Sequence, residues 1–141
     1  MRQYQHSYLR PRTDVPAAWA QDGSVGAASG EILSYVRENP GLTLVAYSPL
    51  LKGSYVRSAA DRPLGPQFDH PGTVARLSAL KAVAAETGAT ANQVVLAWLI
   101  GGEIPVIPLV GASSVPQLDE SLAAVDLELT LDQRARLDTA G

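Results

Sequence analysis

Residues 42–53 read LTLVAYSPLLKG, and this stretch decides the fold class. Its first half, Leu42–Tyr47, is apolar, includes a β-branched valine and threonine, and contains no turn-forming residue. That composition is typical of a strand buried on both faces of a parallel sheet. Ser48-Pro49 ends the strand. Because such a strand needs helices on both sides of its sheet, the stretch indicates an α/β protein.

Two further strands are expected on either side of this one. Residues 104–109 (IPVIPL) predict a strand whose prolines remove ladder donors. Residues 1–12 are short and polar and end near Pro11, which predicts the tail of a strand running into a loop. Residues 13–29 and 51–72 are rich in turn formers and predict two loops.

Helical patterns fill the intervals between the strands. Their predicted ranges are 31–38, 73–86, 90–100, 115–123 and 130–139. Capping boxes at Thr90-Ala91-Asn92-Gln93 and Thr130-Leu131-Asp132-Gln133 open two of them. The helix after Thr90 is apolar nearly all round, so we expect it to be deeply buried. The inward residues expected on helices 73–86 and 115–123 are Val74, Leu77, Leu80, Ala84, Leu118 and Leu122.

Composition narrows the class of protein. The 141 residues are 46% hydrophobic and 18% charged, which predicts one globular domain rather than a disordered chain. A net charge of −3 gives no electrostatic footprint for nucleic acid or for an anionic membrane. With no cysteine and two histidines, thiolate catalysis is excluded and no metal site is expected. The polar N-terminus lacks a secretory leader, so a cytoplasmic location is predicted.

The first candidate binding position is Tyr47, at the carboxyl end of the central strand. Ligands of parallel α/β folds bind at that edge, where a tyrosine can present its ring to a planar ligand. The alternative is that Tyr47 packs against its own loop.

The second candidate is the turn Gly111-Ala112-Ser113-Ser114, which precedes a helix. Free amides of the first helical turn attract an anion, and the serine hydroxyls can donate to phosphate oxygens. The alternative is that the serines cap the helix. Gln117 and Glu120 are expected near a ribose or adenine, or else as solvated helix residues.

Several segments, in their order along the chain, resemble the aldo-keto reductase family. Residues 42–53 are similar to the family's strand-seven signature. Residues 89–99, 106–108 and 111–121 look like its strand-eight and cofactor region, and residues 127–133 resemble its usual close. Gln3 with Ser7-Tyr8-Leu9-Arg10 is similar to the end of the strand-six signature. The resemblance implies a partial (β/α)8 TIM barrel, with residues 1–141 as the C-terminal part of the barrel domain.

The resemblance also implies a cofactor, NADP(H), and a role for each matching position. Tyr47 matches the tyrosine that stacks on the nicotinamide, and Gln3 matches the glutamine that binds its carboxamide. Gly111, Ser113 and Gln117 match the cradle of the 2′-phosphate. The full set implied to bind the cofactor is Gln3, Tyr47, Ser48, Pro49, Leu50, Leu51, Gly111, Ser113, Gln117, Glu120 and Ser121.

The sequence departs from the family pattern at several points. Ser121 and His6 stand where the family commonly has asparagine and tyrosine, and the 111–114 turn lacks a basic residue for the 2′-phosphate. Lys52 or Arg57 can substitute from the long loop. The family's catalytic Asp, Tyr, Lys and His have no counterpart here, so no residue of this chain is predicted to be catalytic.

Two hypotheses follow. In the first, the chain is a truncated part of an NADPH-dependent reductase of aldehydes and ketones, inactive alone, which meets a carbonyl substrate only if an N-terminal half is present. In the second, it is a stand-alone, non-catalytic NADP-binding or protein-interaction module, with open sheet edges covered by self-association or by a partner. A third reading, a helix-turn-helix regulator over residues 73–100, lacks the basic side chains that DNA phosphates require.

Overall fold

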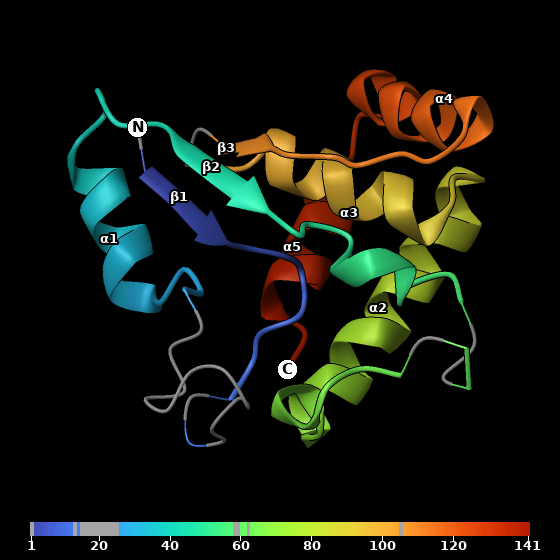
Figure 1. Cartoon of the computed structure of the whole chain (residues 1–141), viewed down its shortest axis with the longest axis horizontal. Coiled ribbons are helices and arrows are strands. Elements are labelled where there is room, and N and C mark those ends of the chain that lie inside the picture. The colour runs from blue at the N-terminus through green and yellow to red at the C-terminus, as the bar shows by residue number, and fades with distance from the viewer. Residues whose placement is uncertain (1, 13, 15–25, 58–59, 62, 105) are drawn as a thin grey trace.

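A computed structural model describes residues 2–12, 14, 26–57, 60–61, 63–104 and 106–141. Three short strands alternate with helices along the chain (Figure 1). The strands and α-helices are β1 (Arg2–Gln5), α1 (Gly30–Glu38), β2 (Leu44–Tyr47), α2 (Pro71–Thr87), α3 (Ala91–Ile100), β3 (Val106–Pro108), α4 (Val115–Ala123) and α5 (Leu131–Thr139). The 3-10 turns are η1 (Leu51–Gly53), η2 (Pro66–Phe68) and η3 (Ala124–Asp126).

The three strands form one parallel sheet in the order β1-β2-β3, which confirms the predicted α/β class. In its register Gln3 lies beside Val45, and Val45 lies beside Ile107. Because side chains alternate along a strand, this row and Tyr47 share one face of the sheet. We call it the open face, because Gln3 and Ile107 are exposed on it.

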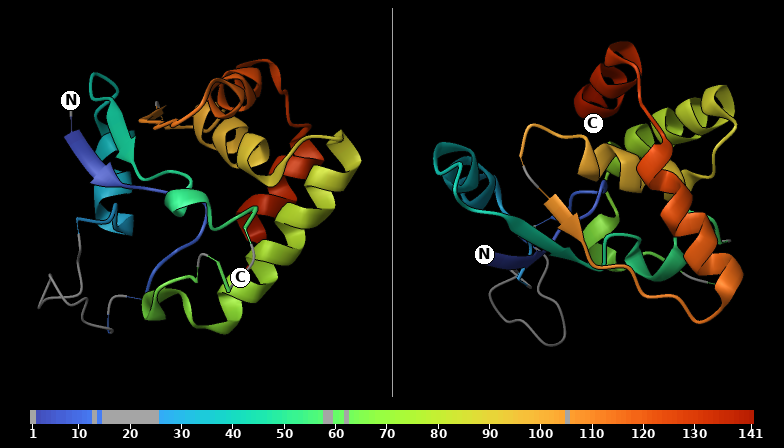
Figure 2. Two further views of the ribbon diagram at one scale, coloured as in Figure 1. Left: turned by 45° about the vertical axis from the view of Figure 1, so that its right-hand side comes forward. Right: turned by 90° about the horizontal axis from the view of Figure 1, so that it is seen from above.

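The opposite face of the sheet carries one of two hydrophobic clusters. Val36 of α1 packs there with Leu44 and Ile104. The larger cluster lies where α2, α3 and α5 meet the segment that follows β1. Figure 2 shows α1 beside β1 and β2, with α2 and α5 at the other end of the molecule. The larger cluster consists of Tyr8, Leu9, Leu51, Phe68, Leu80, Val83, Val94, Val95, Leu99 and Leu137.

The helix ends follow the predicted chemistry. Both capping boxes form, since Thr90 and Thr130 each accept the third amide of their helix and receive the reciprocal glutamine bond. Helix α2 starts two residues earlier than predicted, because Pro71 at its first position lacks the N–H that would otherwise be unsatisfied. Gly88, with φ of 69°, ends it in the left-handed conformation that favours glycine.

The inward face expected for α2 is wrong in part. Val74 is 72% exposed, and the buried residues are Thr73, Arg76, Leu80 and Val83. The helix is rotated because Arg76 takes an inward position. Its Nη1 donates to the carbonyl of Tyr8 at 3.1 Å, and its guanidinium lies 5.1 Å from the centre of the Tyr8 ring. Leu77 and Ala84 are half-buried at the margin of the core.

The prediction for α4 is also wrong. Leu118 and Leu122 are 45% and 57% exposed, and α4 has no buried residue. The helix contacts α3 and η3 with one side, and its leucines point away from both. Helix α3, in contrast, is buried along most of its length as predicted.

The loops are more ordered than the sequence suggests. Turns η1 and η2 lie within the predicted loop 51–72. Of the predicted loop 13–29, residues 13 and 15–25 lie outside the described residues, whereas Gly26 and Ala28 exchange backbone hydrogen bonds with Gln5. No helix within the described ranges is long and apolar enough to cross a membrane, and the cytoplasmic location stays a prediction.

Candidate functional site

Tyr47 is the last residue of β2, and Gln3 lies on the same open face, two residues before the end of β1. Gln3 is exposed and Tyr47 is half-buried. The Tyr47 hydroxyl lies against Gly26, where an added Cβ would stand 2.7 Å from it. Gly26 in turn accepts the Gln5 amide, so it is tied to the end of β1. The tyrosine therefore lies across the carboxyl ends of β2 and β1. The alternative interpretation expected it to pack against its own loop, after β2, whereas Gly26 belongs to the segment before α1.

The segment after β2 contributes backbone rather than side chains. Pro49 and Leu51 are buried, and Leu50 is half-buried against the larger core cluster. Ser48 and Leu51 have φ of 51° and 47°, which is unusual for residues other than glycine. The side chains of Pro49, Leu50 and Leu51 thus anchor this part of the predicted site to the protein interior. The groups left to contact a ligand are the main chain and the Ser48 hydroxyl.

The turn before α4 is exposed, and its donors are satisfied by a neighbouring side chain. The Ser113 amide and the Ser113 hydroxyl both donate to Gln117 Oε1, each at 2.9 Å. Ser114 caps α4 by accepting the Gln117 amide at 3.5 Å. Ser114 therefore caps the helix, as one alternative expected. Ser113, in contrast, points its amide and hydroxyl donors at one position, which the Gln117 side-chain oxygen occupies.

Glu120 and Ser121 are hydrogen-bonded away from that turn. Glu120 Oε1 accepts the Thr90 hydroxyl at 2.6 Å, which ties α4 to the start of α3. The Ser121 hydroxyl donates to the Gln117 carbonyl of its own helix at 3.0 Å. The structure thus brings Ser113, Gln117 and Ser121 together, while Glu120 joins the capping box of the neighbouring helix.

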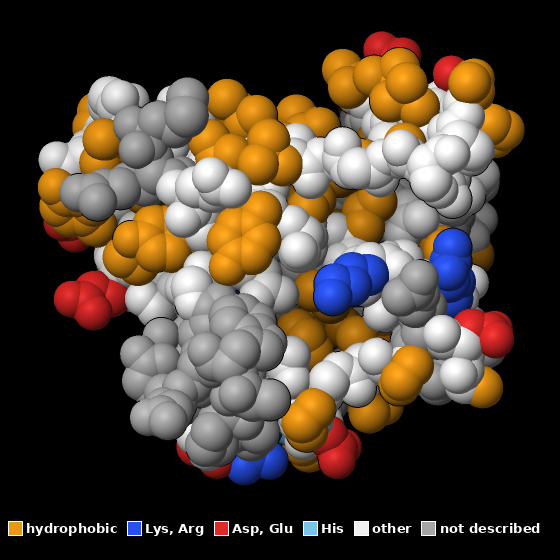
Figure 3. All heavy atoms as spheres, viewed as in Figure 1, with side chains coloured by type: hydrophobic (Ala, Val, Ile, Leu, Met, Phe, Trp, Pro, Cys, Tyr) orange, Lys and Arg blue, Asp and Glu red, His pale blue; other side chains and the backbone are white. Residues whose placement is uncertain are grey.

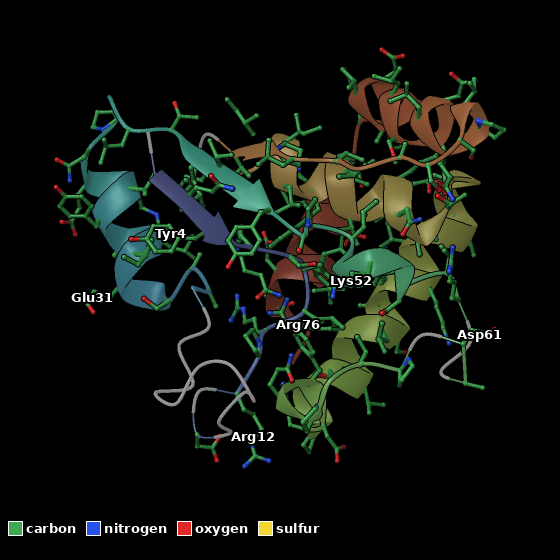
Figure 4. All side chains as sticks on the ribbon, in the orientation of Figure 1. Tyr4, Arg12, Glu31, Lys52, Asp61 and Arg76 are labelled. Carbon is green, nitrogen blue, oxygen red and sulfur yellow. The ribbon has the colours of Figure 1, made fainter. Side chains whose placement is uncertain are left out.

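Positive charge near the site comes from the loop after β2. Helix α4 carries Asp119 and Glu120 but no lysine or arginine. Lys52 is exposed on the same side of the molecule as the sheet's open face (Figure 4). Figure 3 shows Lys and Arg side chains on this side below α4, over the loop segments rather than on the helix. Arg57 folds back over Gly53, where an added Cβ would meet its Nε at 3.5 Å.

Sequence reasoning missed a pair of hydroxyl groups behind the site. The Ser7 hydroxyl donates to the Pro49 carbonyl and lies 2.6 Å from the Tyr55 hydroxyl. The Leu9 amide donates to the same tyrosine oxygen at 3.0 Å. Burial raises the pKa of Tyr55 well above its ordinary value. Alternating polarity in SYL at residues 7–9 gave no signal for these contacts, because they form with residues more than forty positions away.

A separate cavity of about 920 Å³ lies on the other side of the sheet, between α1 and the α3–α5 pair. Leu51 is its only lining residue among the predicted site positions. His6 lines it, and burial together with the nearby Arg10 lowers the pKa of His6 to about 4. Among the residues the structure describes, no group of three His, Asp or Glu side chains is placed to hold a metal ion.

Comparisons with known proteins identify the family. The model of the Aldo/keto reductase family matches residues 25–141. A chloroplastic pyridoxal reductase of Arabidopsis thaliana is 34% identical over 96% of this chain and 39% of its own length. An uncharacterized oxidoreductase of Mycobacterium tuberculosis is 39% identical over 69% of this chain and 33% of its own length.

A solved structure supports the fold assignment. The crystal structure of a thermostable aldo-keto reductase with the inhibitor epalrestat matches with a TM-score of 0.58 and 30% identity. The match covers 78% of this chain and 33% of that one. The predicted fold, part of an aldo-keto reductase barrel, is confirmed. The chain spans between a third and two fifths of the length of these relatives.

Proposed function

The chain belongs to the aldo/keto reductase family, and from that membership, which supports an oxidoreductase function, we propose that it binds NADP(H) along the carboxyl edge of its sheet. The observation that carries the proposal is the shared open face of Gln3 and Tyr47, one strand apart, with an exposed amide and a half-exposed ring. A planar ring laid on Tyr47 would bring a carboxamide substituent toward Gln3. When bound, the dinucleotide supplies the hydride for reduction of an aldehyde or ketone.

The second half of the proposed site is the turn before α4. A 2′-phosphate would take the place of Gln117 Oε1 and receive the Ser113 amide and hydroxyl, because charged oxygens are better acceptors than an amide oxygen. Gly111 has nothing within 4 Å of an added Cβ, so the approach to the turn is open. Lys52 supplies the positive charge that α4 lacks. Preference for NADP(H) over NAD(H) rests on these contacts.

Fluorescence titration of the purified chain with NADPH and with NADH tests this proposal. We expect saturable binding of both, and Ser113→Ala should weaken NADPH by about tenfold while changing NADH little. Ser78→Ala, an exposed serine on α2, is the matched control. Absence of binding would refute the site, and an equal loss for both dinucleotides would refute the phosphate cradle.

We further propose that the proton donor for a carbonyl substrate lies outside residues 1–141. A tyrosine acting as general acid at neutral pH needs a lowered pKa. Burial instead raises the pKa of Tyr8 and of Tyr55. The resemblance also gives no counterpart in this chain of the family's catalytic Asp, Tyr, Lys and His. The chain alone should therefore oxidise no NADPH when an aldehyde is added, as followed by absorbance. Turnover at a rate typical of enzymes would overturn this proposal.

A second candidate function is self-association through the open face. Several large apolar side chains are exposed on β3 and α4. Within the described sheet the outer edge of β3 is unpaired, and the outer edge of β1 is paired only at Gln5, with Ala27. The exposed residues are Ile107, Leu109, Val110, Val115, Leu118, Leu122 and Val125. We propose that a second copy of the chain covers them. Light scattering should show dimers that Ile107→Lys converts to monomers; a wild-type chain that stays monomeric up to its solubility limit would exclude this.

A further inference from the structure

The Ser48–Gly53 segment, which follows β2 and includes η1, holds an unfavourable backbone conformation. Ser48, Leu51 and Lys52 all have φ between 47° and 58°, and Gly53 follows with φ of 90°. Residues with a Cβ avoid this left-handed region, so three of them in five positions persist only where surrounding contacts enforce the conformation. Within the loop itself, the Leu51 amide donates to Ser48 and the Gly53 amide donates to Leu50. Both bonds join residues within the loop, so they do not attach the loop to the rest of the protein.

The attachment comes from the two hydroxyl groups of Ser7 and Tyr55. The Leu9 amide can only donate, and it gives its proton to the Tyr55 oxygen. Ser7 gives its single proton to the Pro49 carbonyl. The 2.6 Å contact between the two hydroxyls must then have Tyr55 as donor and Ser7 as acceptor. The bonds therefore run in one direction, from the Leu9 amide through Tyr55 and Ser7 to the Pro49 carbonyl.

This chain of bonds is shielded from water, so few alternatives to it exist. Ser7 is 6% exposed and Pro49 is buried. Burial raises the pKa of Tyr55, so its hydroxyl is protonated and able to donate at neutral pH. Bonds linked in series in a dry environment strengthen one another. Pro49 has no backbone N–H to donate, so its hydrogen bond to Ser7 is made through its carbonyl oxygen.

We infer that Ser7 and Tyr55 are positioning residues that hold the Ser48–Gly53 segment in the conformation that the dinucleotide requires. The inference rests on the proposed NADP(H) site. Neither hydroxyl touches the open face, since both are committed behind the loop. They act through Pro49 on the main chain of Ser48 and Leu50, the residues that follow Tyr47 at the edge of the site.

The test compares Tyr55→Phe and Ser7→Ala with Tyr8→Phe in the full chain. Tyr8→Phe is a good control because it too removes a buried tyrosine hydroxyl, but one that donates to the Leu137 carbonyl of α5 at 3.1 Å and not to the Ser48–Gly53 segment. Amide hydrogen exchange of residues 48–53 in the unliganded chain is the first measurement. We expect exchange at Leu51 and Gly53 to rise about tenfold in Tyr55→Phe and Ser7→Ala, and to stay unchanged in Tyr8→Phe.

NADPH affinity is the second measurement. Tyr55→Phe and Ser7→Ala should each weaken binding by about tenfold, and the double variant by no more than either alone, because both break the same series of bonds. Ser7→Thr, which keeps the hydroxyl, should restore binding. Tyr8→Phe should lower the melting temperature and leave affinity intact.

The outcomes separate this inference from the proposed function. If the wild-type chain does not bind NADPH, the site fails, whereas the exchange data still decide whether the hydroxyls hold the loop. If exchange at residues 48–53 is the same in Tyr55→Phe as in Tyr8→Phe, the positioning role is refuted. A loss of affinity in all three variants that follows their melting temperatures would refute it as well.

Discussion

Two regions of the molecule use similar side chains in opposite ways. Between α2, α3 and α5, leucines and valines are almost completely buried; Leu80, Val83 and Leu99 are at most 2% exposed. On the open face of the sheet and along α4, equally apolar side chains such as Ile107 and Leu122 are about half exposed. Every predicted cofactor-binding residue belongs to the open face, to α4 or to the loops that border them. The packed region fixes the shape, and the exposed region is left for partners or ligands.

Truncating one leucine in each region gives the strongest test of the difference between the packed and the exposed region. Leu99→Ala in α3 should lower the free energy of unfolding by about 3 kcal/mol, because it empties a buried position. Leu122→Ala in α4 should change it by less than about 0.5 kcal/mol. Urea unfolding of both variants measures the difference. Similar losses would mean that α4 is covered in solution, as the self-association proposal requires, and that the contrast holds only for a single copy.

The pH dependence of stability should originate largely at His6, which lines the cavity between α1 and the α3–α5 pair. The pKa of His6 is about 4 when folded and near 6.5 when unfolded, so the unfolded chain takes up the proton first as pH falls. The free energy of unfolding should therefore drop between pH 6.5 and pH 4, by about 2–3 kcal/mol. Urea unfolding at a series of pH values measures this slope. His6→Gln should flatten it, and an unchanged slope in that variant would show that another group is responsible.

Acid sensitivity from the surface should occupy a lower pH range. Hydrogen bonds from Arg136 and Gln133 lower the pKa of Glu86 to about 2. Its contribution is present above pH 4.5 and is lost as pH falls from there toward 2, so its range overlaps that of His6 only between pH 4 and pH 4.5. The two ranges can thus be separated in one titration.

A glycine pair probes the exposed region directly. Gly26→Ala should lower the free energy of unfolding by about 1–2 kcal/mol, because its φ of 64° disfavours a Cβ and the new atom would meet the Tyr47 hydroxyl. NADPH affinity should fall as Tyr47 is displaced. Gly41→Ala, with nothing within 4 Å of its added Cβ, should change neither quantity. An unaltered affinity in Gly26→Ala would argue against Tyr47 as the nicotinamide platform.

The smallest expected difference is between the two helix caps. Thr90 caps α3 through a complete capping box and also bonds Glu120, whereas Ser114 caps α4 through a single 3.5 Å bond. Thr90→Ala should cost about 1 kcal/mol and Ser114→Ala about half of that. Thermal unfolding of the two variants ranks them. The reverse order would place the weaker structural constraint in α3.

Local patterns in the sequence predicted the local structure well. The apolar run at residues 44–47 forms the central strand, and both threonine capping boxes start helices where expected. These features depend on neighbouring residues alone. The position of Gln3 beside Val45 also agrees with the expected parallel arrangement, because strands of a βαβ unit pair in a limited number of ways.

What the sequence did not predict depends on contacts between distant residues. The periodicity of α4 placed Leu118 and Leu122 inward, but periodicity says which residues share a face, not whether another element covers that face. On α2, Arg76 replaced Val74 on the buried side because the Tyr8 carbonyl and ring accept its guanidinium. The Ser7–Tyr55 contact is of the same kind, since a hydroxyl gives no hint in sequence of the partner that will desolvate it. For the candidate site, the residues were predicted from the family resemblance, and the hydrogen bonds of Gln117 and Glu120 were not.

The all-parallel sheet also delays strand pairing while the chain is being synthesised. No strand can pair with its immediate successor through a tight turn, because about 40 residues separate Gln5 from Leu44 and about 60 separate Tyr47 from Val106. At the ribosome's rate of about 5–20 residues per second, β1 waits roughly 2–8 seconds for β2, and β2 waits longer for β3. During those seconds the emerging chain holds strand edges whose backbone N–H and C=O groups have no partner strand, so its yield in a cell should depend on chaperones that bind nascent polypeptides.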